Sequence, residues 1–420
     1  MRNSPLFKKA LLATATAIGV LSVSAWRAEA GYFQTNLVSD GFLPAELTDP
    51  SLVNPWGVSH SATSPFWTSN QGTSTASLFN VSVTPPTKSA IAPNIPPGGL
   101  GPVGPTGQVH NGSPDPSSFP VIGGDGKSAH FIFANLNGSI SAWDMGATAF
   151  VQATTPGAIY TGLAINAAST QLFAANDAGT GSIDVFNSSF TNVTTPGTFA
   201  TPAAISALKL VPFNVQDING QVYVTYAPSG RAAQQTATPG QGAVAVFSES
   251  GTLMQTIIGS ALAAPWGIAL APADFGQFSN DLLVGNFSYD LNQINAFDPL
   301  TGTLKGTIPI DDGGVPSALW ALNFGIGGQN GRPDILYFTD GIDSETHGLF
   351  GSITAPEPSS FALLAAALVF LGIRRRRFGQ KVVQGSCKHQ RIEVRVAPVT
   401  WAYRRVVRPA VGAPTHQGAR

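Results

Sequence analysis

The sequence is poor in cysteine and in charge. Its one cysteine, Cys387, lies near the C-terminal end, so no disulfide can form upstream of it. Stability must then come from a hydrophobic core, which a chain of 420 residues is long enough to build. Charged residues make up 11% of the chain, against roughly a quarter in typical soluble domains. Glycine (46) and proline (32) are abundant, which favours short strands joined by turns over long helices.

The middle of the chain also lacks basic residues. Between Gly31 and Ile353 there are six lysines and arginines against twenty aspartates and glutamates, a net charge of −14. Nucleic acid binding requires basic side chains that displace counterions from phosphates, so this composition excludes nucleic acid as a partner. An acidic domain is compatible with divalent cations and with solubility outside the cell.

Long hydrophobic runs are absent as well, because no apolar segment reaches the ~20 residues that cross a bilayer comfortably. The N-terminal segment 10–25 is apolar but short, and the small residues Ala28 and Ala30 precede Gly31. Three basic residues precede the apolar segment: Arg2, Lys8 and Lys9. This pattern predicts a secretory signal peptide over residues 1–30, cleaved by signal peptidase before Gly31. The alternative is an uncleaved anchor helix.

A second short apolar run, residues 361–373, lies between a Pro-Glu-Pro tripeptide and a cluster of arginines. The tripeptide is Pro356, Glu357 and Pro358, and the cluster is Arg374, Arg375, Arg376 and Arg377. These elements, in this order over residues 354–377, resemble the PEP-CTERM sorting signal of Gram-negative bacteria. The resemblance implies a short sorting helix, transient membrane insertion with the arginines in the cytoplasm, and cleavage by an exosortase-type enzyme near the tripeptide. It also implies delivery to the cell envelope, the outer surface or the exopolysaccharide matrix.

Residues 378–420 continue beyond the point at which such signals normally end. They contain eight basic residues and one acidic residue, with no apolar periodicity. One interpretation is a cytoplasmic basic tail that contacts anionic lipid. The composition matches nothing upstream, which favours a disordered segment that arose from a reading-frame change or a lost stop codon.

Residues 31–353 repeat a pattern of three or four short strands. An aromatic residue lies near the end of the third strand of each repeat: Phe79, Trp143, Phe186, Phe247, Phe297 and Phe350. One small sheet cannot bury both of its faces, whereas several sheets packed radially can. The repeat therefore predicts an all-β fold, a six-bladed β-propeller, rather than a sandwich or a solenoid.

The repeated pattern Pro-x-Gly-Ile/Val, Leu-x-x-x-Asn and Ile-x-x-Phe is also similar to NHL-type propeller repeats, over most of residues 40–353. Residues 82–128 interrupt it. Their first part is rich in Pro, Gly, Ser and Thr, so we expect a long loop between the first two blades. Such a loop is either functional or, as the plainer interpretation, a flexible surface excursion.

No catalytic motif is present in the middle of the chain. It has no cysteine and no Gly-x-Ser-x-Gly element, and its histidines are His60, His110, His130 and His347. Glycine-rich nucleotide loops and zinc-ligand spacings are also missing. We therefore expect no catalytic residue and no organic cofactor.

Two acidic loops offer hard oxygen ligands of the kind that calcium prefers. One contains Asp311 and Asp312, and the other contains Asp340, Asp343 and Glu345. Neither has the spacing of an EF-hand, and Asp-Gly sequences also form simple turns. Calcium is thus the one metal that the sequence suggests, with turn formation as the alternative.

Asparagines recur after the second strand of the repeats. They are Asn70, Asn135, Asn176 and Asn286, with Asp340 at the corresponding place in the last repeat. Equivalent positions in a propeller form a ring, which could bind sugar hydroxyls or a cation. The alternative is that these side chains cap strand ends by hydrogen bonds to the backbone. Three tryptophans at repeated first-strand positions indicate core packing: Trp56, Trp266 and Trp320.

These features predict an exported protein of the cell surface or extracellular matrix that binds exopolysaccharide and has no catalytic activity. The alternative is a metal-dependent hydrolase or lactonase that acts in the propeller channel. Gluconolactonase-type propellers hold a divalent metal through a Glu, two Asn and an Asp. This chain has no Glu at the corresponding first-strand positions, so the resemblance does not carry that activity over.

Overall fold

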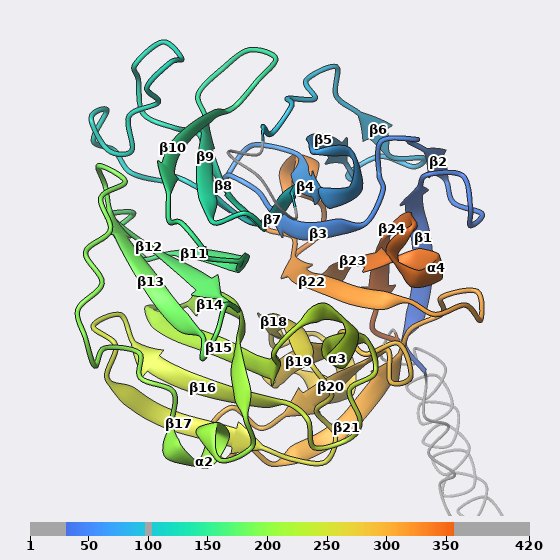
Figure 1. Cartoon of the computed structure of the whole chain (residues 1–420). Coiled ribbons are helices and arrows are strands. Elements are labelled where there is room, and N and C mark those ends of the chain that lie inside the picture. Colours follow the sequence, from blue (N-terminus) through green and yellow to red (C-terminus); the bar gives the residue numbers. More distant parts are fainter. Residues whose placement is uncertain (1–30, 97–102, 357–420) are drawn as a thin grey trace, which may run out of the picture. The chain divides into compact units, whose positions relative to one another are not determined.

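The computed structural model describes residues 31–96 and 103–356. The expected signal peptide, the sorting helix over 361–373, the arginine cluster and the basic tail lie outside these residues, as do Glu357 and Pro358. Six sheets surround a central axis like the blades of a propeller (Figure 1). The predicted all-β, six-bladed fold is confirmed. In the described part of the chain, no helix has the length and apolar character needed to span a membrane.

Blades 1 to 3 follow one another along the chain. Blade 1 consists of β3 (Pro55–Ser59), β4 (Phe66–Asn70), β5 (Thr75–Asn80) and β6 (Thr87–Lys88). Blade 2 consists of β7 (Pro105–His110), β8 (Phe131–Asn135), β9 (Ser139–Trp143) and β10 (Phe150–Thr154). Blade 3 consists of β11 (Tyr160–Ile165), β12 (Gln171–Asn176) and β13 (Ser182–Asn187).

Blades 4 to 6 complete the ring. Blade 4 consists of β14 (Leu210–Ile218), β15 (Gln221–Pro228), β16 (Ala243–Ser248) and β17 (Leu253–Ile258). Blade 5 consists of β18 (Pro265–Leu270), β19 (Leu282–Asn286), β20 (Gln293–Phe297) and β21 (Leu304–Pro309). Blade 6 begins with β22 (Ala318–Phe324), β23 (Ile335–Gly341) and β24 (His347–Thr354).

Short helices lie in the connections. Three are α-helical: α2 (Ala203–Ser206), α3 (Arg231–Gln235) and α4 (Ile342–Glu345). Three are 3₁₀ turns: η1 (Gln71–Thr73), η2 (Gly276–Phe278) and η3 (Gly328–Asn330). Both α3 and α4 connect the second strand of a blade to the third, so they lie on one face of the ring, which we call the α3 face (Figure 1).

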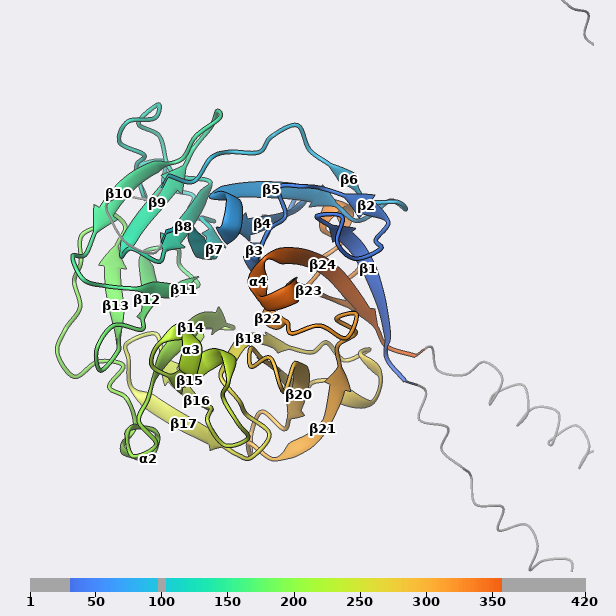
Figure 2. The ribbon, with the colours of Figure 1, turned by 45° about the vertical axis from the view of Figure 1, so that its right-hand side comes forward.

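The N-terminal strand closes the ring. β1 (Phe33–Ser39) pairs antiparallel with β24, from Phe33 opposite Thr354 to Ser39 opposite Leu349. β2 (Leu47–Thr48) then pairs parallel with β1 at the outer edge of the same sheet. Figure 2 shows β1 beside β24 in the last blade. The first and last described strands therefore share one sheet, which joins the two ends of the domain.

The aromatic residues that predicted the repeat all lie in third strands and are buried. They are Phe79 on β5, Trp143 on β9, Phe186 on β13, Phe247 on β16, Phe297 on β20 and Phe350 on β24. Each contributes to hydrophobic clusters within or between blades. The repeat therefore reflects the need of each sheet to bury aromatic area against its neighbours.

The first strands of the blades line the axis and approach one another at backbone distance. A Cβ on Gly57 would lie 2.5 Å from the carbonyl oxygen of Thr106, and one on Gly107 would lie 2.2 Å from the backbone nitrogen of Leu163. Such separations leave no room for a side chain. Glycine at these positions thus allows the inner strands of neighbouring blades to pack closely around the axis.

Aromatic side chains fill the middle of the axis, and we call Trp56, Phe213, Trp266 and Trp320 the aromatic plug. The rings of Trp56 and Trp320 stack with centroids 3.6 Å apart, and Trp266 meets both edge-on. Trp266 Nε1 donates a hydrogen bond of 2.9 Å to the carbonyl oxygen of Thr161 in β11. The three tryptophans therefore serve core packing, as their repeated positions indicated.

The expected loop over residues 82–128 requires a correction, because two strands lie within it. β6 pairs with β5, and β7 is the inner strand of blade 2. The Pro/Gly-rich composition concealed β7 because this strand begins with Pro105, opposite Asn135, where a missing backbone N–H is tolerated. Residues 111–130 then connect the first and second strands of blade 2 rather than two blades.

Candidate functional site

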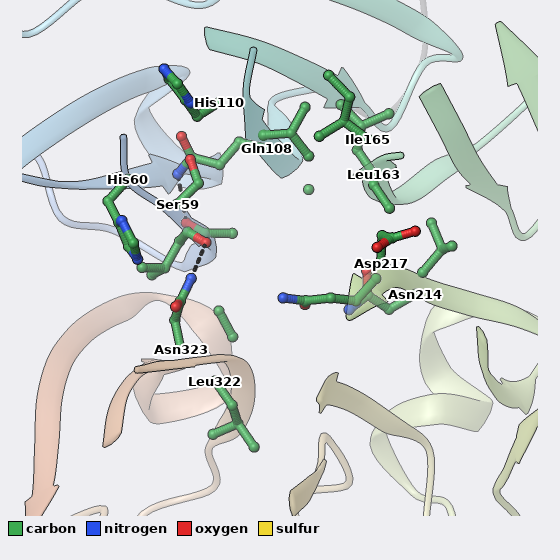
Figure 3. A pocket seen from close by; sticks show the side chains of 18 of the residues that line it. Ser59, His60, Gln108, His110, Leu163, Ile165, Asn214, Asp217, Leu322 and Asn323 are labelled. Carbon is green, nitrogen blue, oxygen red and sulfur yellow. Dashed lines mark hydrogen bonds between the residues drawn. The ribbon is translucent and has the colours of Figure 1, made fainter. Parts of the chain in front are cut away.

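A polar pocket lies at the end of the axis where the inner strands finish, and Figure 3 shows the side chains that line it. Its volume is about 230 Å³. Residues 57–60, 107–110, 163–165, 214–217 and 321–323 line it, together with Trp266 of the plug. All six blades therefore contribute to the pocket, and every lining side chain is held by an inner strand or the residue that follows one.

Three oxygen atoms in the pocket wall are buried and have no hydrogen-bond partner among the described residues. They are Ser59 Oγ, Gln108 Oε1 and Asp217 Oδ2. The Gln108 amide is fixed by its nitrogen, which donates bonds of 2.8 Å to the carbonyl oxygens of Gly57 and Trp67. Asp217 Oδ1 accepts a bond of 3.0 Å from the backbone N–H of Gly220. The pocket thus presents acceptors that lack donors, an arrangement that is costly unless water or a ligand supplies them.

Two imidazoles border the same pocket. Burial lowers the pKa of His60, and burial lowers the pKa of His110, with further lowering by the nearby His130 and His60. Both rings are therefore neutral at pH 7, and each offers one N–H donor and one acceptor nitrogen. His60 Nδ1 lies 3.1 Å from the carbonyl oxygen of Ser61, which occupies one of its nitrogens.

The charge of the pocket is small. Burial, and to a lesser extent the charge of Glu249, raises the pKa of Asp217 to about 6. No lysine or arginine is among the lining residues, which all belong to the described chain. Asn214 Nδ2 donates to the carbonyl oxygen of Trp266 at 2.9 Å, and Asn323 Nδ2 donates to that of Val58 at 3.3 Å. The pocket is thus dominated by neutral hydrogen-bonding groups.

Arg231 of α3 covers the opposite side of the aromatic plug. Its guanidinium carbon lies 4.3 Å from the ring centroid of Phe287, 4.8 Å from that of Trp56 and 4.7 Å from that of Trp320. Arg231 also forms an ion pair with Glu345 of α4. The Glu345 carboxylate accepts further bonds from Asn54 Nδ2 (3.1 Å), Gln235 Nε2 (2.9 Å) and the Tyr289 hydroxyl (2.6 Å). This network closes the axis on the α3 face.

The asparagines expected to form a ring do occupy equivalent positions. Asn70, Asn135, Asn176 and Asn286 each lie opposite the first residue of an inner strand, and Asp340 lies opposite Leu319. Their amides bond locally: Asn70 to Ser77, Asn135 to Ser141, Asn176 to the backbone N–H of Ile159, and Asn286 to the carbonyl oxygen of Ala261. The bonds of Asn176 and Asn286 involve the backbone, as capping of strand ends requires, whereas those of Asn70 and Asn135 reach serine hydroxyls.

The five acidic residues expected as metal ligands are distributed over four places. Glu345 pairs with Arg231, and Asp311 Oδ1 accepts the backbone N–H of Gly313 in a turn. Asp343 lies in α4 with a left-handed backbone conformation, φ 49°. Asp312 and Asp340 come together beside Asn292. Burial, with a contribution from Asp312, raises the pKa of Asp340 to about 7.

A lactonase-type metal centre does not fit the axis of this propeller. The inner strands place the aromatic plug on the axis on the α3 side, and the pocket beyond it has a single carboxylate, Asp217. Across the described residues, no three His, Cys, Asp or Glu side chains gather closely enough to hold one metal ion. The residues at the axis therefore differ from the Glu, Asn and Asp set of that class.

The pocket residues were not identified by sequence reasoning, although a signal exists. Pro55-Trp-Gly-Val-Ser-His60 and Pro105-Thr-Gly-Gln-Val-His110 share one spacing, and Pro212-Phe-Asn-Val-Gln-Asp217 matches it except at the glycine. The sixth position of this pattern is polar in three blades and lies at the pocket. The pattern was missed because Pro105 falls inside the segment expected to be a loop.

The fold and its axial pocket define a six-bladed β-propeller with a closed α3 face. Residues 354–377 match the PEP-CTERM protein-sorting motif. This motif indicates export and sorting to the cell surface in bacteria, and it implies processing by an exosortase.

Two proteins are similar to most of the chain. It is 27% identical over 329 residues to uncharacterized protein R648 of Acanthamoeba polyphaga mimivirus, in an alignment that covers 76% of this chain and 78% of that protein. Among solved structures, a luciferin-regenerating enzyme covers 78% of this chain and 96% of its own, with 13% sequence identity and a TM-score of 0.46.

Proposed function

We propose that this protein is a non-catalytic binding module of the bacterial outer surface or extracellular matrix, and that its axial pocket holds one sugar unit of an exopolysaccharide. The observation that carries the proposal is the set of three buried, unpartnered oxygen atoms in the pocket, on Ser59, Gln108 and Asp217. A ligand rich in hydroxyl groups donates to such acceptors. The neutral ring of His110 supplies an N–H donor for the ligand's own oxygens, whereas His60 directs its N–H at the carbonyl oxygen of Ser61 and offers the ligand an acceptor nitrogen.

The charge and size of the pocket support a small neutral ligand. With no basic lining residue and with the Asp217 carboxyl ionised at pH 7, an anionic ligand would be repelled. The volume of about 230 Å³ lies below the roughly 300–1,000 Å³ of pockets that enclose whole drug-sized ligands. The pocket therefore suits one monosaccharide unit or the end of a glycan chain.

The cellular location of the protein supports the same ligand. The PEP-CTERM motif directs the chain to the cell surface, and we propose the outer surface of a Gram-negative bacterium, where exopolysaccharide is abundant. We further propose that signal peptidase cleaves before Gly31, after the small residues Ala28 and Ala30. The mature propeller would then carry neither terminal signal.

The experiment is co-sedimentation of the purified mature protein with exopolysaccharide from its native cells, together with an assay for released soluble sugar, each with calcium and with a chelator. We expect co-sedimentation without release. Release of sugar would overturn the non-catalytic assignment in favour of a hydrolase. If the protein neither sediments with the polysaccharide nor releases sugar, the proposal fails.

A pair of serine variants tests the pocket itself. Ser59 Oγ and Ser69 Oγ are both buried without a partner among the described residues, but only Ser59 lines the pocket. Ser59→Ala should weaken binding about tenfold, because one hydrogen bond to the ligand is lost. Ser69→Ala should bind as the parent protein does. Equal binding by both variants would place the ligand elsewhere on the molecule.

A further inference from the structure

A second polar cluster lies on the α3 face, where blades 5 and 6 meet, and it is separate from the axial pocket. Asn292 follows β19, Asp312 and Ser317 lie in the connection between β21 and β22, and Asp340 lies on β23. Asn292 Nδ2 lies 3.5 Å from Asp312 Oδ2 and 3.0 Å from Asp340 Oδ2, and it also contacts Ser317 Oγ. The Ser317 hydroxyl in turn donates to Asp312 Oδ2 at 2.9 Å. Four side chains from three segments therefore converge on one point.

The hydrogen-bond donors of this cluster are too few for the oxygen atoms that surround them. An amide nitrogen has two protons, yet Asn292 Nδ2 faces three oxygen atoms. The carbonyl oxygen of the same amide is buried and has no partner among the described residues. The two ends of an Asn amide are distinguished by their hydrogen bonds, so a bound cation would favour the reversed orientation. In that orientation four oxygen atoms would face one another and would require a positive charge between them.

Asp340 provides an independent indication of a missing partner. Its side chain is fully buried, and its Oδ1 atom also has no hydrogen-bond partner in the described part of the chain. No lysine or arginine forms an ion pair with Asp312 or Asp340 in the described part of the chain, although each of five other acidic side chains has a lysine or arginine partner there. A buried carboxylate beside a second carboxylate is unfavourable unless it takes up a proton or a cation compensates the charge, and a cation would keep both groups ionised.

The cluster is reached from solvent. A cavity of about 420 Å³ on the α3 face is lined by Asp312 together with Gln235, Tyr289 and residues 314–316. A cation held by Asp312 would therefore have room on one side for water or for oxygen atoms of a larger ligand. Calcium takes six to eight oxygen ligands, and carboxylates, amide carbonyls and waters are the usual ones.

We propose that Asp312, Asp340, Asn292 and Ser317 form a calcium site, with the remaining coordination positions open to the cavity on the α3 face. Of the five acidic residues suggested by the sequence, this site uses Asp312 and Asp340. It adds Asn292 and Ser317, and it leaves out Asp311, Asp343 and Glu345. The site is distinct from the axial pocket and does not depend on the proposed sugar ligand.

The test is calorimetric titration of the chelator-treated mature protein with calcium chloride, in the absence of any polysaccharide. We expect one bound ion per chain and a rise in the thermal unfolding midpoint, because the ion binds only the folded protein. Asp312→Asn should weaken calcium binding at least tenfold. Asp311→Asn is the matched control, since this neighbouring carboxylate only closes a turn, and it should bind calcium as the parent protein does.

A second variant separates ligation from a merely structural role. Asn292→Asp adds a third carboxylate, so it should lower the unfolding midpoint in chelator and raise calcium affinity. The proposal is overturned if the parent protein binds no calcium at millimolar concentration, if Asp312→Asn and Asp311→Asn behave alike, or if Asn292→Asp lowers affinity. Equal affinity for magnesium would overturn the assignment to calcium.

Discussion

Buried carboxyl groups make the stability of this propeller depend on pH. Asp177 on the α3 face is almost fully buried, accepts one bond of 3.2 Å from Gln234 Nε2, and has its other oxygen unpartnered among the described residues. Burial raises the pKa of Asp177 to about 6, above the ~3.9 of an unfolded chain. The folded state therefore binds more protons between about pH 4 and pH 6, and stability falls as the pH rises through this window.

We predict that Asp177→Asn stabilises the protein at pH 8 by up to about 3 kcal/mol and flattens part of this pH dependence. The measurement is the free energy of unfolding in urea at pH 4, 6 and 8. Asp298→Asn is the control with the opposite sign, because backbone N–H bonds from Thr301 and Leu300 lower the pKa of Asp298. That variant should lose stability at pH 8. A stability difference between variant and parent that does not grow from pH 4 to pH 8 would contradict the prediction; the parent alone is not decisive, because the lowered pKa values of His60 and His110 act in the opposite direction.

At the residue scale, the sequence indicated candidate residues by their chemical type, but it did not indicate which side chains they contact in the folded protein. The two acidic loops predicted Asp312, Asp340 and Glu345 alike as metal ligands, and the sequence could not show that Glu345 faces Arg231. That contact joins α3 in blade 4 to α4 in blade 6, which are adjacent only after the ring has formed. The pocket acceptor on Gln108 was invisible for the same reason, since its bonds reach blade 1.

At the scale of the element, the inner strands are specified by backbone contact rather than by side-chain burial. A Cβ at Gly107 would meet the backbone of the next blade at 2.2 Å, and backbone atoms in a packed sheet cannot move aside. We predict that Gly107→Ala destabilises the protein by about 3 kcal/mol. Gly259→Ala is the control, because nothing lies within 4 Å of its added Cβ. The measurement is the free energy of unfolding of the two variants in a chemical denaturant. Equal free energies would contradict the prediction, because they would mean that the inner strands can move apart to accommodate the added Cβ.

The strands that sequence predicted best are those with strong side-chain signals. Phe297 and Phe247 marked third strands because each packs into an interface between sheets, and such aromatic area recurs in every blade. β7 was missed because its first residues, Pro105 to Gly107, carry the composition of a turn. These residues pack against β11 in the next blade. Such a contact between distant parts of the chain cannot be inferred from the local sequence pattern.

At the scale of the whole molecule, the ring is held closed by the pairing of β1 with β24. Val38 of β1 is fully buried opposite Phe350, whereas Phe33 on the same strand is 62% exposed. We predict that Val38→Asp destabilises the whole ring by about 3–5 kcal/mol, because an unpaired charge would be buried in the closing sheet. Phe33→Asp should have little effect. Fluorescence of the tryptophans in the aromatic plug and circular dichroism should report one shared transition, and separate transitions for the two signals would contradict a cooperative ring.

The closing pair also sets an order of events during synthesis of the chain. β1 is the first of the described strands to be synthesised, and its partner β24 ends at Thr354, where the sorting motif begins. Until β24 emerges, β1 remains an unpaired edge that can associate with other chains. The ring can therefore close only after β24 has been synthesised, and β24 ends where the sorting motif begins. A chain that stops before β24 would keep an open edge and would also lack the sorting motif, so unclosed rings of this kind would not be sorted.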